Sequence, residues 1–221
     1  MVRERYHEKL NSLENDLVKM AGMVADAIEG SVDSLVKRDI KRSREIMKND
    51  AVINKRRFKI EERCLRLIAT QQPMARDLRT IAAILNIITD LERIADHAEG
   101  IAKINVLIGK KPLAKPLIDV PRMAEKGVSM LNRCIDAFIN RDAKSAKAIC
   151  KEDDDVDALY EQIYRELLLI MIENPKTIEG ATYLMWVAHN LERIADRVTN
   201  IAERVIFMVT GSMEEANVSK Y

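Results

Sequence analysis

The hexapeptide Leu-Glu-Arg-Ile-Ala-Asp occurs twice in this chain, at residues 91–96 and at residues 191–196. The sequence around it repeats too, because Arg38-Asp39 returns 103 residues later as Arg141-Asp142. Self-similarity over such a distance indicates an internal duplication. It constrains the fold more than any other feature, because both copies must be able to form the same arrangement.

The duplication divides the 221 residues into a first half, residues 1–110, and a second half, residues 111–221. Three prolines lie between residues 110 and 121, which is the stretch that reads as a linker between the halves. The chain is long enough to bury a substantial apolar core, and its length is typical of one or two domains.

Apolar residues near the N-terminus follow steps of three and four, as in Leu10, Leu13, Leu17, Met20 and Val24. This spacing is typical of one face of a long helix. Only 7 glycines and 5 prolines interrupt the chain, and no segment alternates as a strand would. The sequence therefore predicts an all-α fold.

Turn signals divide each half into three helices. In the first half the turns are predicted at Arg38-Asp39 and Gln72-Pro73, and in the second half at Arg141-Asp142 and Asn174-Pro175. The fifth helix is expected to run unbroken over about residues 143–172. Because short connections make neighbouring helices antiparallel, we predict two tandem pseudo-symmetric antiparallel three-helix bundles with six long helices.

Composition argues against several classes of protein. A net charge of +1 is too small for a general nucleic-acid binder, and no run approaches the roughly 18 apolar residues of a membrane-spanning helix. Three widely spaced cysteines favour free buried thiols in a reducing compartment. The charged N-terminus does not resemble a signal peptide, so we expect a cytoplasmic protein without membrane insertion.

Basic residues cluster around the hairpin predicted in the first half, among them Lys55, Arg56, Arg57, Arg63 and Arg66. A solvated helix surface explains such a cluster, and a docking surface for an acidic partner is the alternative. The sequence leaves both interpretations open.

Acidic residues spaced by four recur in both halves, in the pairs Glu92/Asp96, Asp153/Asp157 and Glu192/Asp196. Residues four apart lie on one helix face at about 5–6 Å, where like charges repel each other. In the first half Asp50 corresponds to Asp153, and Asn54 stands where the second acid would be. A counter-charge is expected to offset the repulsion.

The acids of each half lie at matched distances from the predicted turn. In an antiparallel hairpin, equal distances from the turn mean equal height, so the acids should meet across one helix pair. We name Asp50, Glu92 and Asp96 the first acidic cluster. The second acidic cluster consists of Asp153, Asp157, Glu192 and Asp196.

Carboxylate-rich clusters suit divalent cations, so both acidic clusters are predicted metal sites. The alternative is that Arg93, Arg193, Arg197 and lysines of neighbouring helices neutralise the acids in surface ion pairs. His97 and His189 do not fit the Glu-x-x-His pattern of di-iron bundles. A glycine-rich phosphate loop, a nucleophile elbow and a Cys-x-x-Cys pair are absent from the sequence, so we do not expect an enzyme.

Two tandem three-helix units, each with an acidic element in its second helix and the hexapeptide in its third, resemble the PhoU family of phosphate-regulatory proteins. The resemblance covers nearly the whole chain, including Gln72-Pro73 and Asp77-Leu78-Arg79. It implies a cytoplasmic negative regulator of phosphate uptake and of the phosphate-starvation response. The implied partners are the ATPase subunit of a phosphate transporter and a membrane sensor histidine kinase.

The resemblance also implies a homodimer, and iron or zinc on the two acidic motifs, beside the magnesium or manganese that carboxylates alone suggest. All the residues of both acidic clusters match the family's motif positions, and Asn54 departs from them. The alternative function is a structural or interaction bundle in which the acids make only ion pairs.

Overall fold

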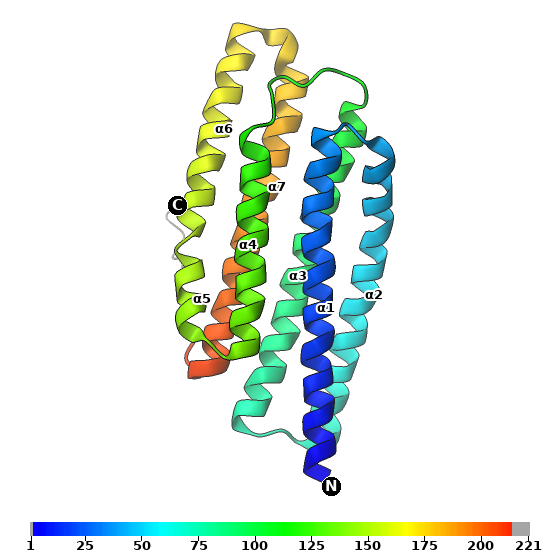
Figure 1. Ribbon diagram of the computed structural model, residues 1–221, viewed down its shortest axis with the longest axis vertical. Helices are drawn as coiled ribbons and strands as arrows, with labels where there is room; N and C mark the ends of the chain where they lie inside the picture. The colour runs from blue at the N-terminus through cyan, green and yellow to red at the C-terminus, as the bar shows by residue number, and fades with distance from the viewer. Residues whose placement is uncertain (1, 214–221) are drawn as a thin grey trace.

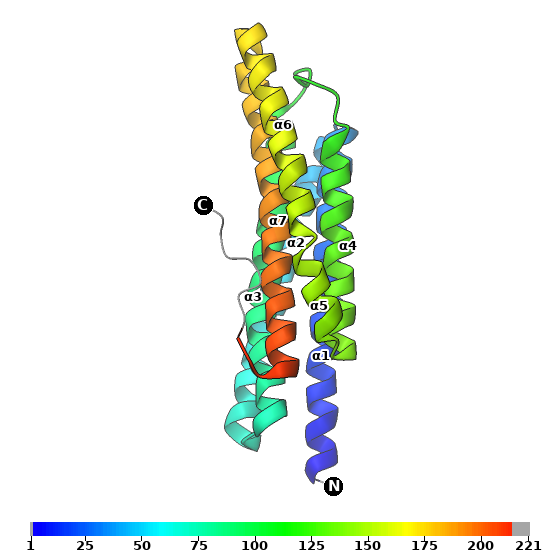
Figure 2. The ribbon, with the colours of Figure 1, turned by 90° about the vertical axis from the view of Figure 1, so that its left-hand side faces the viewer.

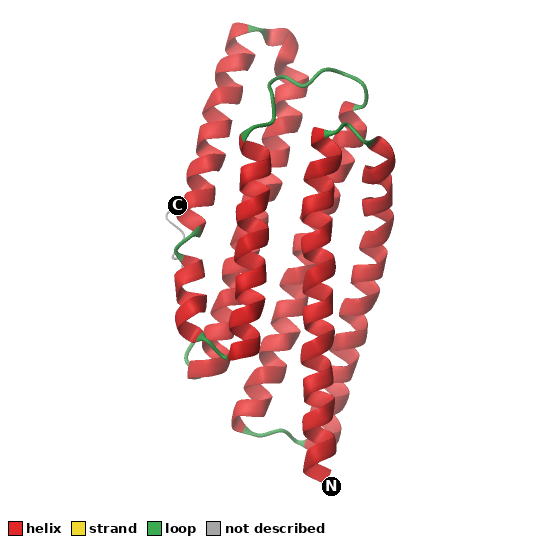
Figure 3. Cartoon of the chain, in the orientation of Figure 1, coloured by secondary structure: helices red, strands yellow, loops and turns green. Residues whose placement is uncertain are grey.

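The computed structural model describes residues 2–213, with side chains from residue 6 onward. Its helices, in chain order, are α1 (Val2–Val36), α2 (Ile40–Gln71), α3 (Ala75–Ile108), α4 (Asp119–Asn140), α5 (Ala143–Cys150), α6 (Asp153–Glu173), the 3₁₀ turn η1 (Pro175–Thr177) and α7 (Ile178–Thr210). No strand occurs in this range (Figures 1 and 3). The predicted all-α fold is confirmed.

Helices α1, α3, α4 and α7 form the centre of the molecule, and α2 and α5–α6 flank it. Seen edge-on, α1 and α4 form one layer on the right, and α3 and α7 lie to their left in a second layer (Figure 2). Buried apolar side chains from all seven α-helices make one continuous core, so the two halves share their interior. No described helix is long and apolar enough to cross a membrane.

The two predicted Arg-Asp turns have the same construction. Arg38 and Arg141 adopt positive φ angles of 58° and 56°. The aspartate that follows each arginine caps the next helix: Asp39 accepts from the backbone N–H of Arg42, and Asp142 accepts from two N–H groups of α5. The spacing of 103 also relates α1 to α4, because both members of the pairs Met20/Met123, Ile28/Leu131 and Leu35/Phe138 are buried.

The predicted fifth helix is broken, and the expectation of an unbroken helix is wrong at Lys151 and Glu152. Their N–H groups bond three residues back, at 3.2 and 3.0 Å. Helix α6 then starts with Asp153-Asp154-Asp155, and acids are favoured at a helix N-terminus by the helix dipole. The first half has Asp50-Ala51-Val52 at this place, and α2 continues through it. Helices α5 and α6 together occupy the place of one helix in the predicted six.

The contact between α3 and α7 repeats itself under the duplication. His97 Nδ1 lies 3.0 Å from Asn190 Oδ1, and Arg197 Nη1 lies 3.6 Å from Asp90 Oδ1. Position 97 of α3 thus contacts position 190 of α7, and position 90 contacts position 197. At the spacing of 100, position 90 corresponds to position 190 and position 97 to position 197, so each contact joins one position to the counterpart of the other. This exchange is typical of an isologous interface between two copies. The halves therefore pack as the subunits of a symmetric dimer would.

The basic residues of α2 are largely engaged within the molecule. Arg63 pairs with Asp16 of α1, and Arg66 pairs with Glu62 one helical turn away. These contacts favour the interpretation of a solvated helix surface. The three cysteines are buried free thiols, as predicted.

Candidate functional site

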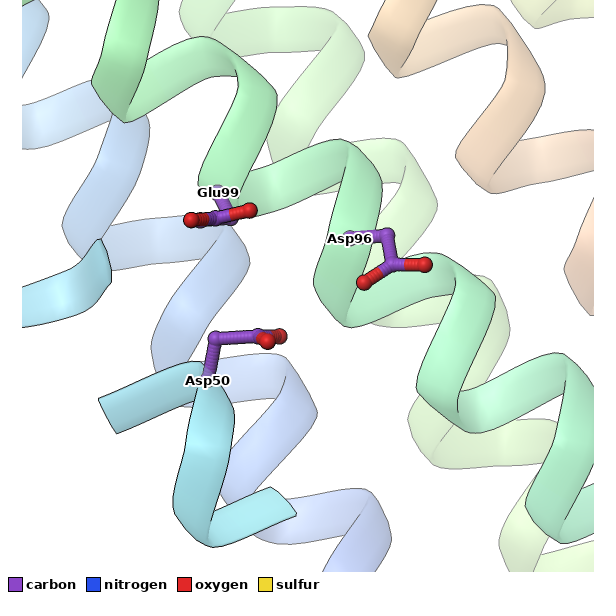
Figure 4. Close-up of side chains that lie close together, drawn as sticks. All are labelled: Asp50, Asp96 and Glu99. Carbon is purple, nitrogen blue, oxygen red and sulfur yellow. The ribbon is translucent and has the colours of Figure 1, made fainter. Parts of the chain in front are cut away.

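Helices α2 and α3 bring three carboxyl groups together in the first half (Figure 4). One oxygen from each of Asp50, Asp96 and Glu99 lies within 4.8 Å of the others. Asp50 comes from α2, and the other two come from α3. The predicted approach of Asp50 and Asp96 at equal height is therefore confirmed. Glu92, the third acid of the first acidic cluster, is not part of this group of three.

Asn54 takes a direct part in this arrangement. Its Nδ2 donates a hydrogen bond to Asp50 Oδ2 at 2.8 Å. The other oxygens of the pair, Asp50 Oδ1 and Asn54 Oδ1, are buried and accept no hydrogen bond within the described part of the chain. Because buried polar atoms normally have a partner, these two oxygens are available to a ligand.

The surroundings of the first acidic cluster disfavour the ionised form of its carboxyl groups. The pKa of Asp50 is raised to about 6, first by burial and then by the charges of Asp96, Glu99 and Glu92. Burial also raises the pKa of Glu92 and that of Asp96, and a neighbouring carboxylate is the next cause in each. A bound cation would stabilise the ionised form of all of them.

Glu99 is a candidate ligand that the repeat does not reveal, because Thr199 stands at its place in the second half. A signal was present in its spacing, since it follows Asp96 by three residues and shares its helix face. Lys103, one turn further on, donates to Glu99 Oε2 at 2.6 Å. This contact balances part of the negative charge of Glu99.

The second acidic cluster lies between α6 and α7. Asp153, the first residue of α6, is only 4% exposed. Its pKa is raised to about 7 by burial and then by the charges of Asp157, Asp196 and Glu192. Burial also raises the pKa of Glu192 to about 7, with Asp196 as the next cause. The four predicted acids thus act as one electrostatic group. Their oxygens are more widely spread, because among residues 2–213 only the group in the first half meets the 4.8 Å separation.

An ion pair neutralises part of the second acidic cluster. Arg193 Nη1 donates to Asp196 Oδ2 at 2.5 Å. His189 Nδ1 lies 3.5 Å from Glu192 Oε2, and this buried oxygen accepts no hydrogen bond within the described part of the chain. The predicted neutralisation by an arginine is therefore present at Asp196. Arg197, which was expected to neutralise the same acids, pairs instead with Asp90 outside the cluster, in the α3–α7 contact.

The side chains of both clusters offer oxygen donors. Carboxylate and amide oxygens are the ligands that hard divalent cations prefer, and iron accepts them as well. The buried oxygens of Asp50 and Asn54 fit such an ion. Zinc sites more often use cysteine and histidine, so the donor set fits magnesium, manganese or iron better than zinc.

The sequence profile of the PhoU domain matches the chain twice, over residues 17–104 and 120–205. The chain belongs to the PhoU family. Each match covers one three-helix unit and contains one of the two acidic clusters. The PhoU family consists of accessory and regulatory proteins and not of enzymes, in agreement with the sequence.

Relatives match this chain along nearly its whole length. The phosphate-specific transport system accessory protein PhoU homolog of Clostridium acetobutylicum is 38% identical over 98% of this chain and 100% of its own. The homolog of Aquifex aeolicus is 38% identical over 93% of both chains.

Two solved structures have the same fold. PhoU from Pseudomonas aeruginosa superposes with a TM-score of 0.90 at 31% identity, over 94% of this chain and 100% of its own. The phosphate transport system regulatory protein PhoU from Streptococcus pneumoniae superposes with a TM-score of 0.89 at 28% identity, over 95% and 99%.

Proposed function

We propose that this PhoU-family chain is a cytoplasmic regulator that restrains phosphate uptake and the phosphate-starvation response. The observation that carries the proposal is the match of both halves to the family, with full-length relatives named as accessory proteins of the phosphate-specific transport system.

The proposed partners are the ATPase subunit of the phosphate transporter and a membrane sensor histidine kinase. The protein would act as a homodimer. It would bind no nucleic acid, and its net charge of +1 is consistent with that. Sedimentation of the purified protein tests the oligomeric state. A molar mass near 25.2 kDa at all concentrations would contradict the homodimer.

The two acidic clusters are proposed to hold metal ions, iron or manganese in the first place. In the first half the ligands would be Asp50 and Asp96, with Glu92 and Glu99 beside them. In the second half they would be the four residues of the second acidic cluster. An ion in either place would join the two helices of a hairpin and stabilise their ionised carboxylates.

A pull-down from lysate, with and without phosphate in the medium, tests the regulatory role. Tagged wild-type protein should retain the transporter ATPase and the sensor kinase at near-physiological salt. For variants in which acids of the two clusters are replaced, Asp136→Asn is the matched control, because Asp136 is an exposed acid of α4 outside both clusters. Loss of both partners from the wild-type sample, with the bait folded, would count against the proposal.

An interaction scaffold without metal is the second candidate function. The pairs Arg193–Asp196 and Lys103–Glu99 favour it, because they supply counter-charges from within the chain. Under this alternative, melting of the protein is the same with and without a chelator.

A further inference from the structure

A pocket of about 320 Å³ opens between α1 and α2, beside the first acidic cluster. Met23, Ile46 and Ile53 contribute apolar walls. Asp50 and Glu99 reach it from α2 and α3, the two helices that carry them in Figure 4. A space of this size admits a small molecule or one long side chain.

The second half bridges the corresponding groove with an ion pair between its helices. Lys126 Nζ of α4 donates to Asp155 Oδ2 of α6 at 2.8 Å. At the spacing of 103, the first half has Met23 in place of Lys126 and Val52 in place of Asp155. Both replacements line the pocket, so the loss of this bridge leaves the groove open.

A second bridge in the second half has also been replaced. Arg133 Nη1 of α4 donates to Glu152 Oε1 at 2.7 Å, and its other terminal nitrogen bonds the second oxygen of Glu152. The first half has Gly30 and Asn49 at these positions. Gly30 lies against the wall of the pocket, because a Cβ placed there would be 3.3 Å from Ile46 Cδ1.

The second half keeps a pocket of about 230 Å³ nearer to the α4–α5 turn. None of the residues of the second acidic cluster lines it. This pocket therefore differs from the one in the first half, which lies beside an acidic cluster.

The charges around this pocket are mainly negative. Asp26, Asp50 and Glu99 line it with carboxylates, and Arg42 is the one basic residue among its lining residues. Lys103, from outside the lining, pairs with Glu99, so Asp26 and Asp50 carry most of the negative charge. Arg42 Nη1 already lies 3.3 Å from Glu45 Oε2 on its own helix. Carboxylates above apolar walls complement a cationic group on an aliphatic chain, because such a chain packs along apolar surface while its charged end stays at the polar edge.

We propose that this pocket binds an amphipathic organic cation, an ammonium or guanidinium group carried on an aliphatic chain. Two sources supply this chemistry: a lysine or arginine side chain of a partner protein, and a free aliphatic polyamine. The site goes beyond the proposed regulatory function and does not require a bound metal.

Binding of the organic cation and of a metal should oppose each other. A divalent ion held by Asp50, Asp96 and Glu99 would engage two of the three carboxylates of the pocket. By linkage, each ligand then weakens the other by the same factor. Metal in the first half would therefore release the organic cation, and the second half would show no such competition.

The test is an NMR titration of the full-length, metal-free protein with labelled isoleucine and methionine methyl groups. The probes are N-acetyl-lysine amide, N-acetyl-arginine amide and spermidine, with N-acetyl-norleucine amide as the uncharged control. Saturable shifts are expected at the methyl groups of Met23, Ile46 and Ile53. Because the protein is metal-free, a failure of metal binding leaves this test intact.

Two variants locate the site. The double variant Met23→Lys with Val52→Asp copies the bridge of the second half and should abolish binding. Asp26→Asn should weaken binding about two- to fivefold, and Asp33→Asn, on the same helix outside the pocket, should leave it unchanged. Asp26 is exposed, so its variant keeps the test valid if the double variant loses helix content in circular dichroism.

The two sources are told apart by which probes bind. Binding of the lysine or arginine derivative alone assigns the pocket to a partner side chain, and binding of spermidine alone assigns it to a free polyamine. Equal shifts with the norleucine derivative would overturn the proposal. Full binding to the folded double variant, or shifts confined to other methyl groups, would overturn it too.

Discussion

Replacing Asp153 by asparagine should stabilise the metal-free protein at pH 8 and should do so much less at pH 5. In the folded protein the pKa of Asp153 is raised from 3.8 to about 7, chiefly by burial. Between these two values the folded state holds a proton that the unfolded state has lost. The stability of the wild type therefore falls as pH rises through this window, and above pH 7 the loss is complete.

The size of the effect follows from the same shift. About three pKa units correspond to at most about 4 kcal/mol, at about 1.4 kcal/mol per unit. Asparagine loses the favourable contact of a negative charge with the N-terminus of α6, which opposes the gain by up to about 1 kcal/mol. We expect a net gain of about 2–3 kcal/mol at pH 8, a rise in Tm of about 5–10 °C for a chain of this length.

Urea unfolding followed by the helix signal in circular dichroism measures this difference at pH 5 and pH 8 in excess chelator. Asp136→Asn, an exposed acid on α4, is the control and should change the free energy of unfolding by less than about 0.5 kcal/mol. If Asp153→Asn were less stable than the wild type at pH 8, and less stable by the same amount at pH 5, the raised pKa of Asp153 would be refuted as the cause of a pH-dependent loss of stability.

Three further substitutions test the fold, each by urea unfolding. Asp39→Ala removes the cap of α2 and should cost about 1 kcal/mol, with Asp39→Asn tolerated. Asn105→Ala removes one donor from the Ser34 carbonyl and one from the Ser43 hydroxyl, each of which keeps another partner, and should cost about 1–2 kcal/mol; a loss below about 0.5 kcal/mol would contradict this. Arg197→Met removes the cationic partner of Asp90 and should cost about 2 kcal/mol at pH 8 and less in acid, because burial raises the pKa of Asp90 and favours its neutral form; an equal loss at both ends of the pH range would speak against the pairing.

The duplication and the periodicity predicted most of the architecture, because both are regular along the chain. The turns at Arg38-Asp39 and Arg141-Asp142 follow from residues that cap helices, and the meeting of Asp50 with Asp96 follows from counting residues outward from one turn. The packing of α3 against α7 was beyond such reasoning. It depends on which faces of the two halves fit each other, and no repeat within one half contains that information.

Differences between the halves were the hardest to predict. The break before Asp153 arises from a run of three acids that the first half lacks, and the repeat itself suggested an unbroken helix. Glu99 was missed because its counterpart in the second half is Thr199, so a search for acids that occur in both halves does not find it. The sequence predicted the composition of the acidic clusters, whereas their geometry required the folded chain.

Elemental analysis of protein purified without chelator tests most directly whether each half folds a helix hairpin around a cation. The account predicts metal in at least stoichiometric amount in the wild type, reduced in a variant that combines Asp153→Asn with Glu192→Gln, and a Tm that falls when excess EDTA is added. A wild-type protein with no metal above background, and with the same Tm in EDTA, would contradict it.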